Sequence, residues 1–273
     1  MKKICFSVFS AIDLLQAGEY NKKDIWDTEE DCFMAYRYKT ELHCHSKYVS
    51  SCSDVGAKEI VEQYLEFGYS TVVITDHLHE GTFQHWIPEA GLDERMEFFL
   101  NGYRKVKEYA KGRLNVLLGC EIRFPNTGGT DFLVYGADED FFKNNPDMYR
   151  HERYWMGSLV HNNGCMFFQA HPFRFGMMLA EDYVVDGIEV FNGHPTQKSH
   201  NRMAEEWMKE YPSFIGISGS DHHGLEQYPD AGILTEAPIT SNAQLLEVLR
   251  SGAFICIRDT DTMESCRQKI LGT

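Results

Sequence analysis

The chain has 273 residues and a formal net charge of −15, from 41 acidic and 26 basic residues. Its hydrophobic content of 43% and charged content of 25% are typical of a globular protein with a substantial core. So acidic a surface repels anionic membranes and argues against long nucleic acid as a partner, and no run of about 18 apolar residues could span a membrane.

The cysteines and the N-terminus bear on location and domain organisation. The eight cysteines are scattered without a CxxC pair, which indicates reduced thiols and a cytoplasmic protein. Met1-Lys2-Lys3 and the apolar run after it faintly resemble a signal peptide, but Asp13 interrupts the run and no small-residue cleavage site follows. We expect residues 1–37 to form an N-terminal extension that packs on a single domain, residues 38–273.

In chain order, short apolar strands alternate with amphipathic helices. Apolar residues recur at helical spacing at Ile60, Val61 and Tyr64, and Gly68 ends that helix. The same criteria predict helices over 57–67, 93–110, 152–163, 197–209 and 242–250, and strands over 36–45, 70–75, 114–118, 132–135, 165–170, 187–191 and 214–218. Shorter strand segments, 233–234 and 253–257, flank the last helix. This alternation predicts parallel strands with crossover helices, in about seven units, enough to close a barrel.

Histidines and carboxylates gather where the predicted strands end. In an extended strand, residues two apart point to the same side, so His43 and His45 would share one space. The other strand ends supply Asp76/His77, Glu121, His171, Asn192/His194 and Asp221/His223. The active site of such a barrel lies at the C-terminal ends of its strands. The pattern therefore predicts one convergent metal site, whose nitrogen and oxygen donors suit zinc, manganese or iron.

These motifs resemble the polymerase-and-histidinol-phosphatase (PHP) family of metal-dependent phosphoesterases. The matching pieces, in the family's order from about residue 38 to 225, are His43-Cys44-His45, Ser53-Asp54, Thr75-Asp76-His77, Gly119-Cys120-Glu121, Ala170-His171-Pro172, Gly187-Ile188-Glu189-Val190 and Gly219-Ser220-Asp221-His222-His223. The resemblance implies an α/β fold, a distorted (β/α)7 TIM-like barrel.

The resemblance also implies two or three divalent metal ions. One would be held by His43, His45, Glu121 and Asp221; a second by Glu121, His171 and Asp131; a third by Asp54, His77 and His223. Two positions depart from the family. Val55 replaces the glycine that follows Asp54 in many relatives, and Asp131 stands where many have histidine. Asp131 has an alternative role, which is to hydrogen-bond the loop Thr127–Thr130.

The expected activity is hydrolysis of a small phosphomonoester or nucleotide, with a metal-bridging hydroxide as the nucleophile. Glu121 and Asp221 would be catalytic through the ions, and Arg174 would neutralise charge on the phosphoryl group. Arg174, Arg123 and His194 are the candidates for substrate binding. Each has an ordinary alternative: surface ion pairs for the two arginines and a turn for His194.

Two other functional classes fit the same residues. Fold and metal ligands do not fix the bond that is cleaved, so a metal-dependent hydrolase of a non-phosphate bond is the main alternative. The other is a metal-binding module without catalysis, which the nearly complete set of ligands disfavours. The sequence does not indicate the substrate or the oligomeric state.

Overall fold

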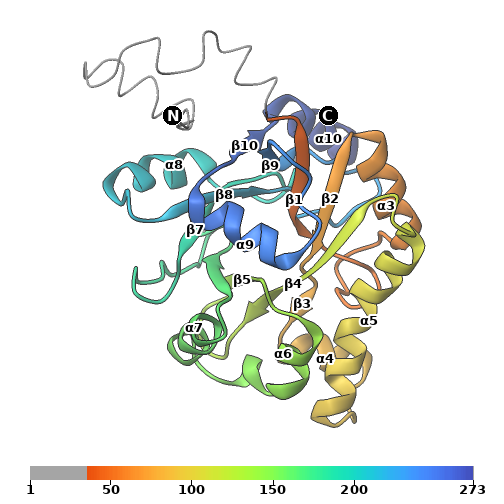
Figure 1. Cartoon of the computed structure of the whole chain (residues 1–273), viewed down its shortest axis with the longest axis vertical. Coiled ribbons are helices and arrows are strands. Elements are labelled where there is room, and N and C mark those ends of the chain that lie inside the picture. Colours follow the sequence, from red (N-terminus) through yellow and green to blue (C-terminus); the bar gives the residue numbers. More distant parts are fainter. Residues whose placement is uncertain (1–35, 273) are drawn as a thin grey trace.

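One ten-stranded sheet forms the centre of the computed structural model, which describes residues 36–272 (Figure 1). The strands are β1 (Tyr38–Cys44), β2 (Tyr69–Ile74), β3 (His77–Leu78), β4 (Asn115–Arg123), β5 (Asp131–Tyr135), β6 (Met166–Gln169), β7 (Gly187–Asn192), β8 (Ile215–Gly219), β9 (Ala231–Thr235) and β10 (Ile255–Arg258). Their order is β10-β9-β1-β2-β4-β5-β6-β7-β8, with β3 paired to β4.

The sheet nearly closes on itself because β1 meets the segment that follows β8. Cys44 and His222 form a parallel bridge. The His45 N–H donates to the carbonyl of His222 (3.0 Å), and the His222 N–H donates to the carbonyl of His43 (3.2 Å). Strands β1, β2 and β4 to β8 therefore surround one interior, which confirms the predicted distorted TIM-like barrel.

The direction of β5 differs from the prediction. It pairs antiparallel with both β4 and β6, so the expectation of parallel strands throughout the barrel is wrong for this strand. Only residues 124–130 connect β4 to β5, and a parallel connection needs a crossover of a dozen or more residues. Gly128 and Gly129, both with positive φ, form the turn. As a result, the first residue of β5 lies at the same edge of the sheet as the last residues of its neighbours.

Helices cover the outside of the barrel. They are α3 (Ala57–Glu66), α4 (Glu80–Trp86), α5 (Leu92–Ala110), α6 (Glu139–Asn144), α7 (Arg153–Asn162), α8 (Asn201–Glu210), α9 (Asn242–Ser251) and α10 (Thr260–Leu271), with a 3-10 turn, η1 (Met148–Arg150). In α5 the predicted inner face is buried, including Met96, Phe99, Leu100 and Val106. The larger of two hydrophobic clusters contains these residues and apolar side chains of α3 and several strands.

Helix α9 covers the end of the barrel opposite the C-terminal strand ends. Its Leu245, Leu246 and Leu249 join the second hydrophobic cluster, together with Leu42, Phe168 and other strand residues. The side chain of Asn242 donates to the carbonyl of Ala137, just after the C-terminal end of β5. Because β5 is antiparallel, this is the edge where the parallel strands begin. This end of the barrel is therefore filled by apolar side chains, and the polar side chains gather at the opposite end.

Several predicted boundaries shift. β4 runs past the predicted end at Leu118, so Glu121 lies within the strand, α8 starts later than predicted, and α10 was not predicted at all. All but two residues of the proposed extension 1–37 lie outside the described residues, so its packing stays a prediction.

The six cysteines of the described part are free thiols. None of the described helices is long and apolar enough to cross a membrane.

Candidate metal centre

All of the predicted ligands except Asp54 meet at the C-terminal end of the barrel. They come from the end of β1 and the residue after it (His43, His45), β3 (His77), β4 (Glu121), the start of β5 (Asp131), the residues just after β6 (His171) and those just after β8 (Asp221, His223). Three groups offer donor atoms that all lie within 4.8 Å of one another: His43/His45/Glu121/Asp221, Glu121/Asp131/His171 and His45/His77/His223. The first matches the expected ligand set for one ion, and the second matches that for another.

Glu121 lies between these groups. Its Oε1 is 3.4 Å from His43 Nε2 and 2.9 Å from His171 Nε2, and its Oε2 is 3.4 Å from His45 Nε2 and 2.9 Å from His77 Nδ1. Burial raises the pKa of this carboxyl, but the charges of His43 and His77 more than offset it and hold the pKa well below its usual range. A carboxylate whose two oxygens face different imidazoles has the arrangement required of a bridging ligand.

Several buried donor atoms of this cluster make no well-aligned hydrogen bond within the described part of the chain, although some of them lie 2.9–3.4 Å from one another. They are His43 Nε2, His45 Nε2, His77 Nδ1, Glu121 Oε2 and His171 Nδ1. Leaving a buried polar group unpaired costs about 1–3 kcal/mol, so such a concentration needs a physical explanation. Imidazole nitrogen and carboxylate oxygen are ligands for zinc, manganese and iron. The residues present therefore fit divalent metal ions.

Other side chains orient the imidazoles. Glu189 Oε1 lies 2.9 Å from His43 Nδ1, and Glu189 Oε2 accepts the backbone N–H of His171 (2.9 Å). His45 Nδ1 lies 3.2 Å from the Ser50 hydroxyl, which donates to Asp76 (2.8 Å). Metal-binding histidines commonly use the second nitrogen in this way. These contacts leave the Nε2 atoms of His43 and His45 directed into the cluster.

Two candidate ligands lie at strained backbone positions. His171 has φ 28° and Asp221 has φ 50°, in the left-handed region that non-glycine residues rarely adopt. Such conformations persist where the surrounding structure holds them, and they concentrate at functional sites. Both residues follow strands directly, where the chain turns across the end of the barrel.

Arg174, a candidate for substrate binding, contacts one of the candidate ligands. One of its nitrogens, Nη2, donates to Asp221 Oδ2 (2.6 Å) and to Asn192 Oδ1 (2.8 Å), and its Nε donates to Ser199 (3.1 Å). Burial raises the pKa of Asp221, but His43 and Arg174 more than offset it and hold the pKa well below its usual range. Asn192, which the sequence placed only at a strand end, also donates to Glu189 (2.8 Å). It therefore connects Arg174 with the carboxylate that orients His43.

Arg123 and Asp131 form a bidentate pair. The guanidinium Nε and Nη2 lie 2.6 and 2.7 Å from the two oxygens of Asp131. The Asp131 side chain therefore hydrogen-bonds to Arg123 instead of to the loop Thr127–Thr130, while its Oδ2 also lies 4.0 Å from His171 Nε2. Burial and the nearby Glu121 raise the pKa of Asp131. Arg123 partly offsets this effect.

His194 lies beside the third group but is held by a turn. Its Nδ1 accepts the N–H groups of Thr196 (3.3 Å) and Gln197 (3.2 Å), and its ring centre lies 5.6 Å from that of His223. Burial lowers the pKa of His194 to about 4, so the ring is neutral at physiological pH. His194 therefore both stabilises a turn and lies beside the metal centre, the two roles that the sequence left open for it.

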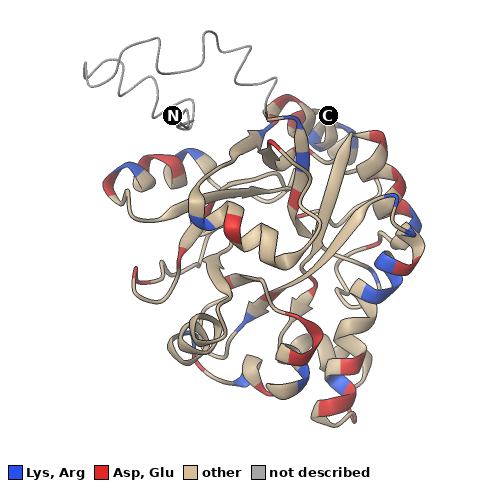
Figure 2. Ribbon diagram, in the orientation of Figure 1, with Lys and Arg blue, Asp and Glu red and all other residues tan. Residues whose placement is uncertain are grey.

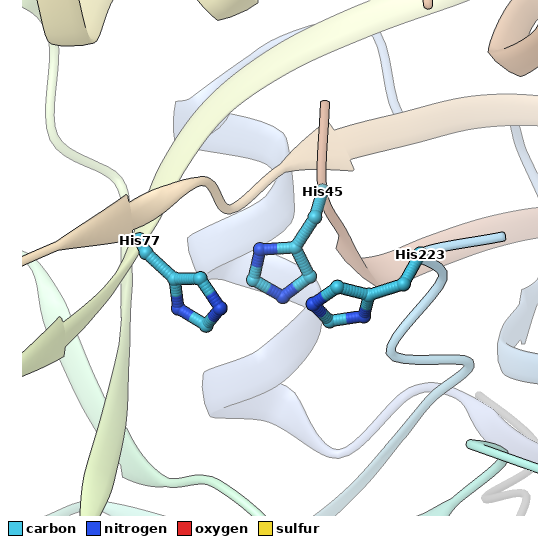
Figure 3. A group of neighbouring side chains, drawn as sticks. All are labelled: His45, His77 and His223. Atoms are coloured by element: carbon cyan, nitrogen blue, oxygen red, sulfur yellow. The ribbon is translucent and has the colours of Figure 1, made fainter. Parts of the chain in front are cut away.

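The third group differs from the predicted set. Figure 3 shows the imidazole rings of His45, His77 and His223 turned toward one another. Asp54 is exposed, accepts the N–H of Leu225 (2.9 Å) and belongs to none of the three groups found among residues 36–272. Cys52, which the sequence analysis did not single out, lies near His223 and His77 but also belongs to none of these groups. Burial raises the pKa of this thiol, but the two histidines more than offset that and lower it to about 6.

Comparison with known proteins gives the family. The family model of the PHP domain matches residues 41–229, more than half of the chain and all of the metal centre. The chain belongs to the PHP domain family. No curated protein matches this PHP domain significantly.

Solved structures share the fold of this PHP domain at low sequence identity. A two-domain protein from Bacteroides vulgatus that contains a predicted PHP-like metal-dependent phosphoesterase has a TM-score of 0.61 at 16% identity, covering 82% of this chain and 66% of that one. PsfC from Pseudomonas syringae has a TM-score of 0.61 at 13% identity, covering 86% and 99%. Endonuclease Q in complex with a 27-mer duplex has 0.54 at 12%, covering 78% and 56%. The PHP domain thus spans less than two thirds of the first and third proteins.

Proposed function

We propose that this protein is a metal-dependent phosphoesterase that hydrolyses a small phosphomonoester or nucleotide. The observation that carries the proposal is the position of Glu121, whose two oxygens face His171 and His43 on one side and His45 and His77 on the other. Bound divalent ions would supply a Lewis acid for the phosphoryl oxygens and an activated water as the nucleophile. Zinc, manganese and iron all suit the donor set.

The protein side chains have distinct roles in this proposal. Glu121 would be shared by the ions, and Asp221 presents Oδ1 to His43 and His45 (3.4 and 3.3 Å). The other oxygen of Asp221 holds Arg174, which is only 15% exposed and already oriented by Asn192. A guanidinium fixed beside the ion ligands would bind phosphoryl oxygens and stabilise charge that develops during transfer.

A cavity of about 780 Å³ adjoins the metal centre and supports an anionic substrate. Asn192 and His194, which contact the centre, form part of its wall. The remaining charged side chains of the wall are four cations and one carboxylate: Lys198, Arg202, Arg258, Arg267 and Glu205. Because Arg258 pairs with Glu205 and Arg267 pairs with Glu264, the positive charge that the wall offers a substrate comes mainly from Lys198 and Arg202. These two cations favour a substrate with negative charge beyond the scissile phosphate.

The fold alone does not separate small phosphoesters from nucleic acid, because Endonuclease Q bound to duplex DNA has a similar fold. Charge favours the small substrate. Lys and Arg are interspersed with Asp and Glu along the outer helices (Figure 2), and the excess of acidic residues repels a long polyanion. The expectation against long nucleic acid therefore rests on electrostatics and stays a prediction.

The test combines metal analysis with a substrate screen. Protein expressed with added zinc, manganese or iron should contain at least two tightly bound ions per chain by elemental analysis. It should release phosphate from members of a panel of sugar phosphates, nucleotides, histidinol phosphate and phosphotyrosine, in the presence of manganese. An abasic-site duplex and a panel of amide and ester substrates test the alternatives.

Glu121→Gln should lose metal and activity together, because a neutral amide bridges two cations poorly. Glu66→Gln, at an exposed position at the end of α3, is the matched control and should change neither. Less than one ion per chain after metal-supplemented expression would refute the proposal. Hydrolysis confined to the duplex or to the amide and ester panel would replace it with one of the alternatives.

A further inference from the structure

The cavity beside the metal centre is lined by two residues that hold Arg174. Asn192 and Ser199 both form part of its wall, and the guanidinium of Arg174 donates to Asn192 Oδ1 (2.8 Å) and to the Ser199 hydroxyl (3.1 Å). The same guanidinium donates to the candidate ligand Asp221 (2.6 Å). The cavity volume of about 780 Å³ is within the range of small-molecule sites. A substrate whose scissile phosphate is at the ions therefore has room to extend into the cavity.

Two cations of the cavity wall have no partner in the described chain. Lys198 and Arg202 are exposed, and neither side chain forms an ion pair or a hydrogen bond with any other described residue. Lys198 directly precedes Ser199 in the chain, and Arg202 is the second residue of α8. Glu205, the one carboxylate among the described residues of the wall, is paired with Arg258. The described wall therefore offers unpaired positive charge to an anion, and its carboxylate is already engaged.

We infer that Lys198 and Arg202 bind a second anionic group of the substrate, a phosphate or a carboxylate, while its scissile phosphate lies at the metal centre beside Arg174. The inference rests on the proposed function and narrows its substrate class from phosphoesters in general to small molecules with two anionic groups. A guanidinium binds either oxyanion through a fork of N–H donors, and an ammonium binds either as a point charge. Pro195 and Met203, which also line the cavity, would contact the uncharged part of the substrate.

The test compares phosphoesters that differ mainly in the second anionic group. The pairs are fructose bisphosphate with fructose phosphate, phosphoglycerate with glycerol phosphate, and phosphoserine with phosphoethanolamine. The metal-loaded full chain should hydrolyse the bis-anionic member of a pair with a kcat/KM about tenfold or more above that of its partner, because the second group adds a charge-assisted contact. The bisphosphate and the two carboxylates distinguish the two kinds of second group.

Substitutions in the cavity wall test the residues. Lys198→Ala and Arg202→Ala should each reduce the preference by about tenfold, mainly by raising KM for the bis-anionic member and with less effect on kcat. Lys198→Arg should retain the preference, because the guanidinium keeps the charge. Lys209→Ala, which removes an exposed lysine paired with Glu206 on the same helix, is the matched control. Metal content and thermal unfolding of each variant establish that the metal centre and the fold are intact.

The two proposals fail in different ways. A wild-type protein that hydrolyses phosphoesters but prefers the bis-anionic member of no pair would overturn the inference, as would a preference that survives when Lys198 and Arg202 are both replaced by alanine. Neither result would affect the proposed function. For a protein that hydrolyses no phosphoester, calorimetry measures the binding of fructose bisphosphate to the metal-loaded chain. Binding that both alanine substitutions weaken and Lys209→Ala does not would support the inference and count against the proposed function alone. Absent or unaltered binding would overturn the inference as well.

Discussion

At the scale of single residues, the two oxygens of Asp221 have different partners. Oδ1 faces His43 and His45, and Oδ2 accepts from Arg174 at 2.6 Å. The ion ligand and the arginine partner are therefore different atoms of one carboxylate. This separation predicts that the arginine is dispensable for metal binding.

Arg174→Ala should retain metal and lose catalytic efficiency. If the guanidinium contacts the phosphoryl group, its removal should raise the barrier by roughly 2–4 kcal/mol. Measuring kcat/KM together with metal content checks this, and Arg174→Lys should recover part of the loss. Arg153→Ala, which removes an arginine paired to Glu181 away from the metal ligands, is the control. Normal kinetics in Arg174→Ala would remove this residue from the substrate site.

Asp131 is the candidate ligand that stands where the resemblance to the family implies a histidine. It is buried, lies 4.0 Å from His171 and is paired to Arg123 through both oxygens. Arg123 thus serves at least as a positioning partner for this carboxylate.

Asp131→Asn should lower the affinity for the second ion by about tenfold or more, because the amide carries no charge and cannot replace the carboxylate–guanidinium pair. The ion at His43 and His45 should stay bound. Asp131→His should restore occupancy, since imidazole is an acceptable ligand for the same ions. Titration of the metal-free protein with zinc, followed by calorimetry, measures both. Unchanged affinity for every ion in Asp131→Asn would assign this residue to Arg123 alone.

At the scale of elements, close packing of β8 against β1 positions the first histidine. A Cβ atom on Gly219 would lie 2.4 Å from His43 Cβ and 2.7 Å from Glu189 Oε1. Real Cβ atoms do not approach so closely, so a side chain here would displace His43, Glu189 or both. The glycine is required by the neighbouring strand and not by its own backbone conformation.

Gly219→Ala should destabilise the metal-free protein by about 1–3 kcal/mol and weaken binding of the ion held by His43. Gly224→Ala is the matched control, because a Cβ there meets nothing within 4 Å. Thermal unfolding in the presence of a chelator and zinc titration separate the two effects. Equal behaviour of the two variants would show that the end of the barrel adjusts freely.

At the scale of the whole molecule, the metal centre connects the first strand of the barrel, β1, with the segment that follows β8. Its ligands extend from β1 to the segment after β8, the two places where the sheet nearly closes. Ions bound there would hold these segments together and stabilise the folded state by linkage. Without ions, a proton on His43 would take over part of that role, because the pKa of His43 is raised by the carboxylates around it.

The stabilisation by metal should grow as the pH rises. Burial lowers the pKa of His43, but Asp221, Glu189 and Glu121 more than offset this and raise the pKa well above its usual value of 6.5. A raised folded-state pKa stabilises the metal-free protein fully below the unfolded-state pKa, and this stabilisation is lost as the pH rises through the folded-state value.

The difference in Tm between zinc-loaded and metal-free protein should therefore be larger at about pH 8 than at about pH 6. Above the unfolded-state pKa the stabilisation of the metal-free protein by the proton on His43 decreases with pH, and protons compete less with the ions. Differential scanning calorimetry at both pH values measures this. A difference in Tm that falls with pH would show that protons on His43 do not stabilise the metal-free fold.

The sequence by itself determined most of the candidate metal ligands. The alternation of side chains in a strand brings His43 and His45 to one side, and the C-terminal ends of barrel strands share one edge, so Glu121, His171 and Asp221 could be predicted to converge. These are local periodicities and one rule of architecture. Neither requires knowledge of which distant residues touch.

The tertiary structure alone decided the pairings between distant segments. The short link after β4 reversed β5, which put Asp131 at the site and its carboxylate against Arg123. The loop after β1 left Asp54 beside Leu225 and outside the cluster of candidate ligands, although the sequence placed it among them. Loop conformation and ion pairing depend on packing between segments far apart in the chain, for which local sequence patterns carry no signal.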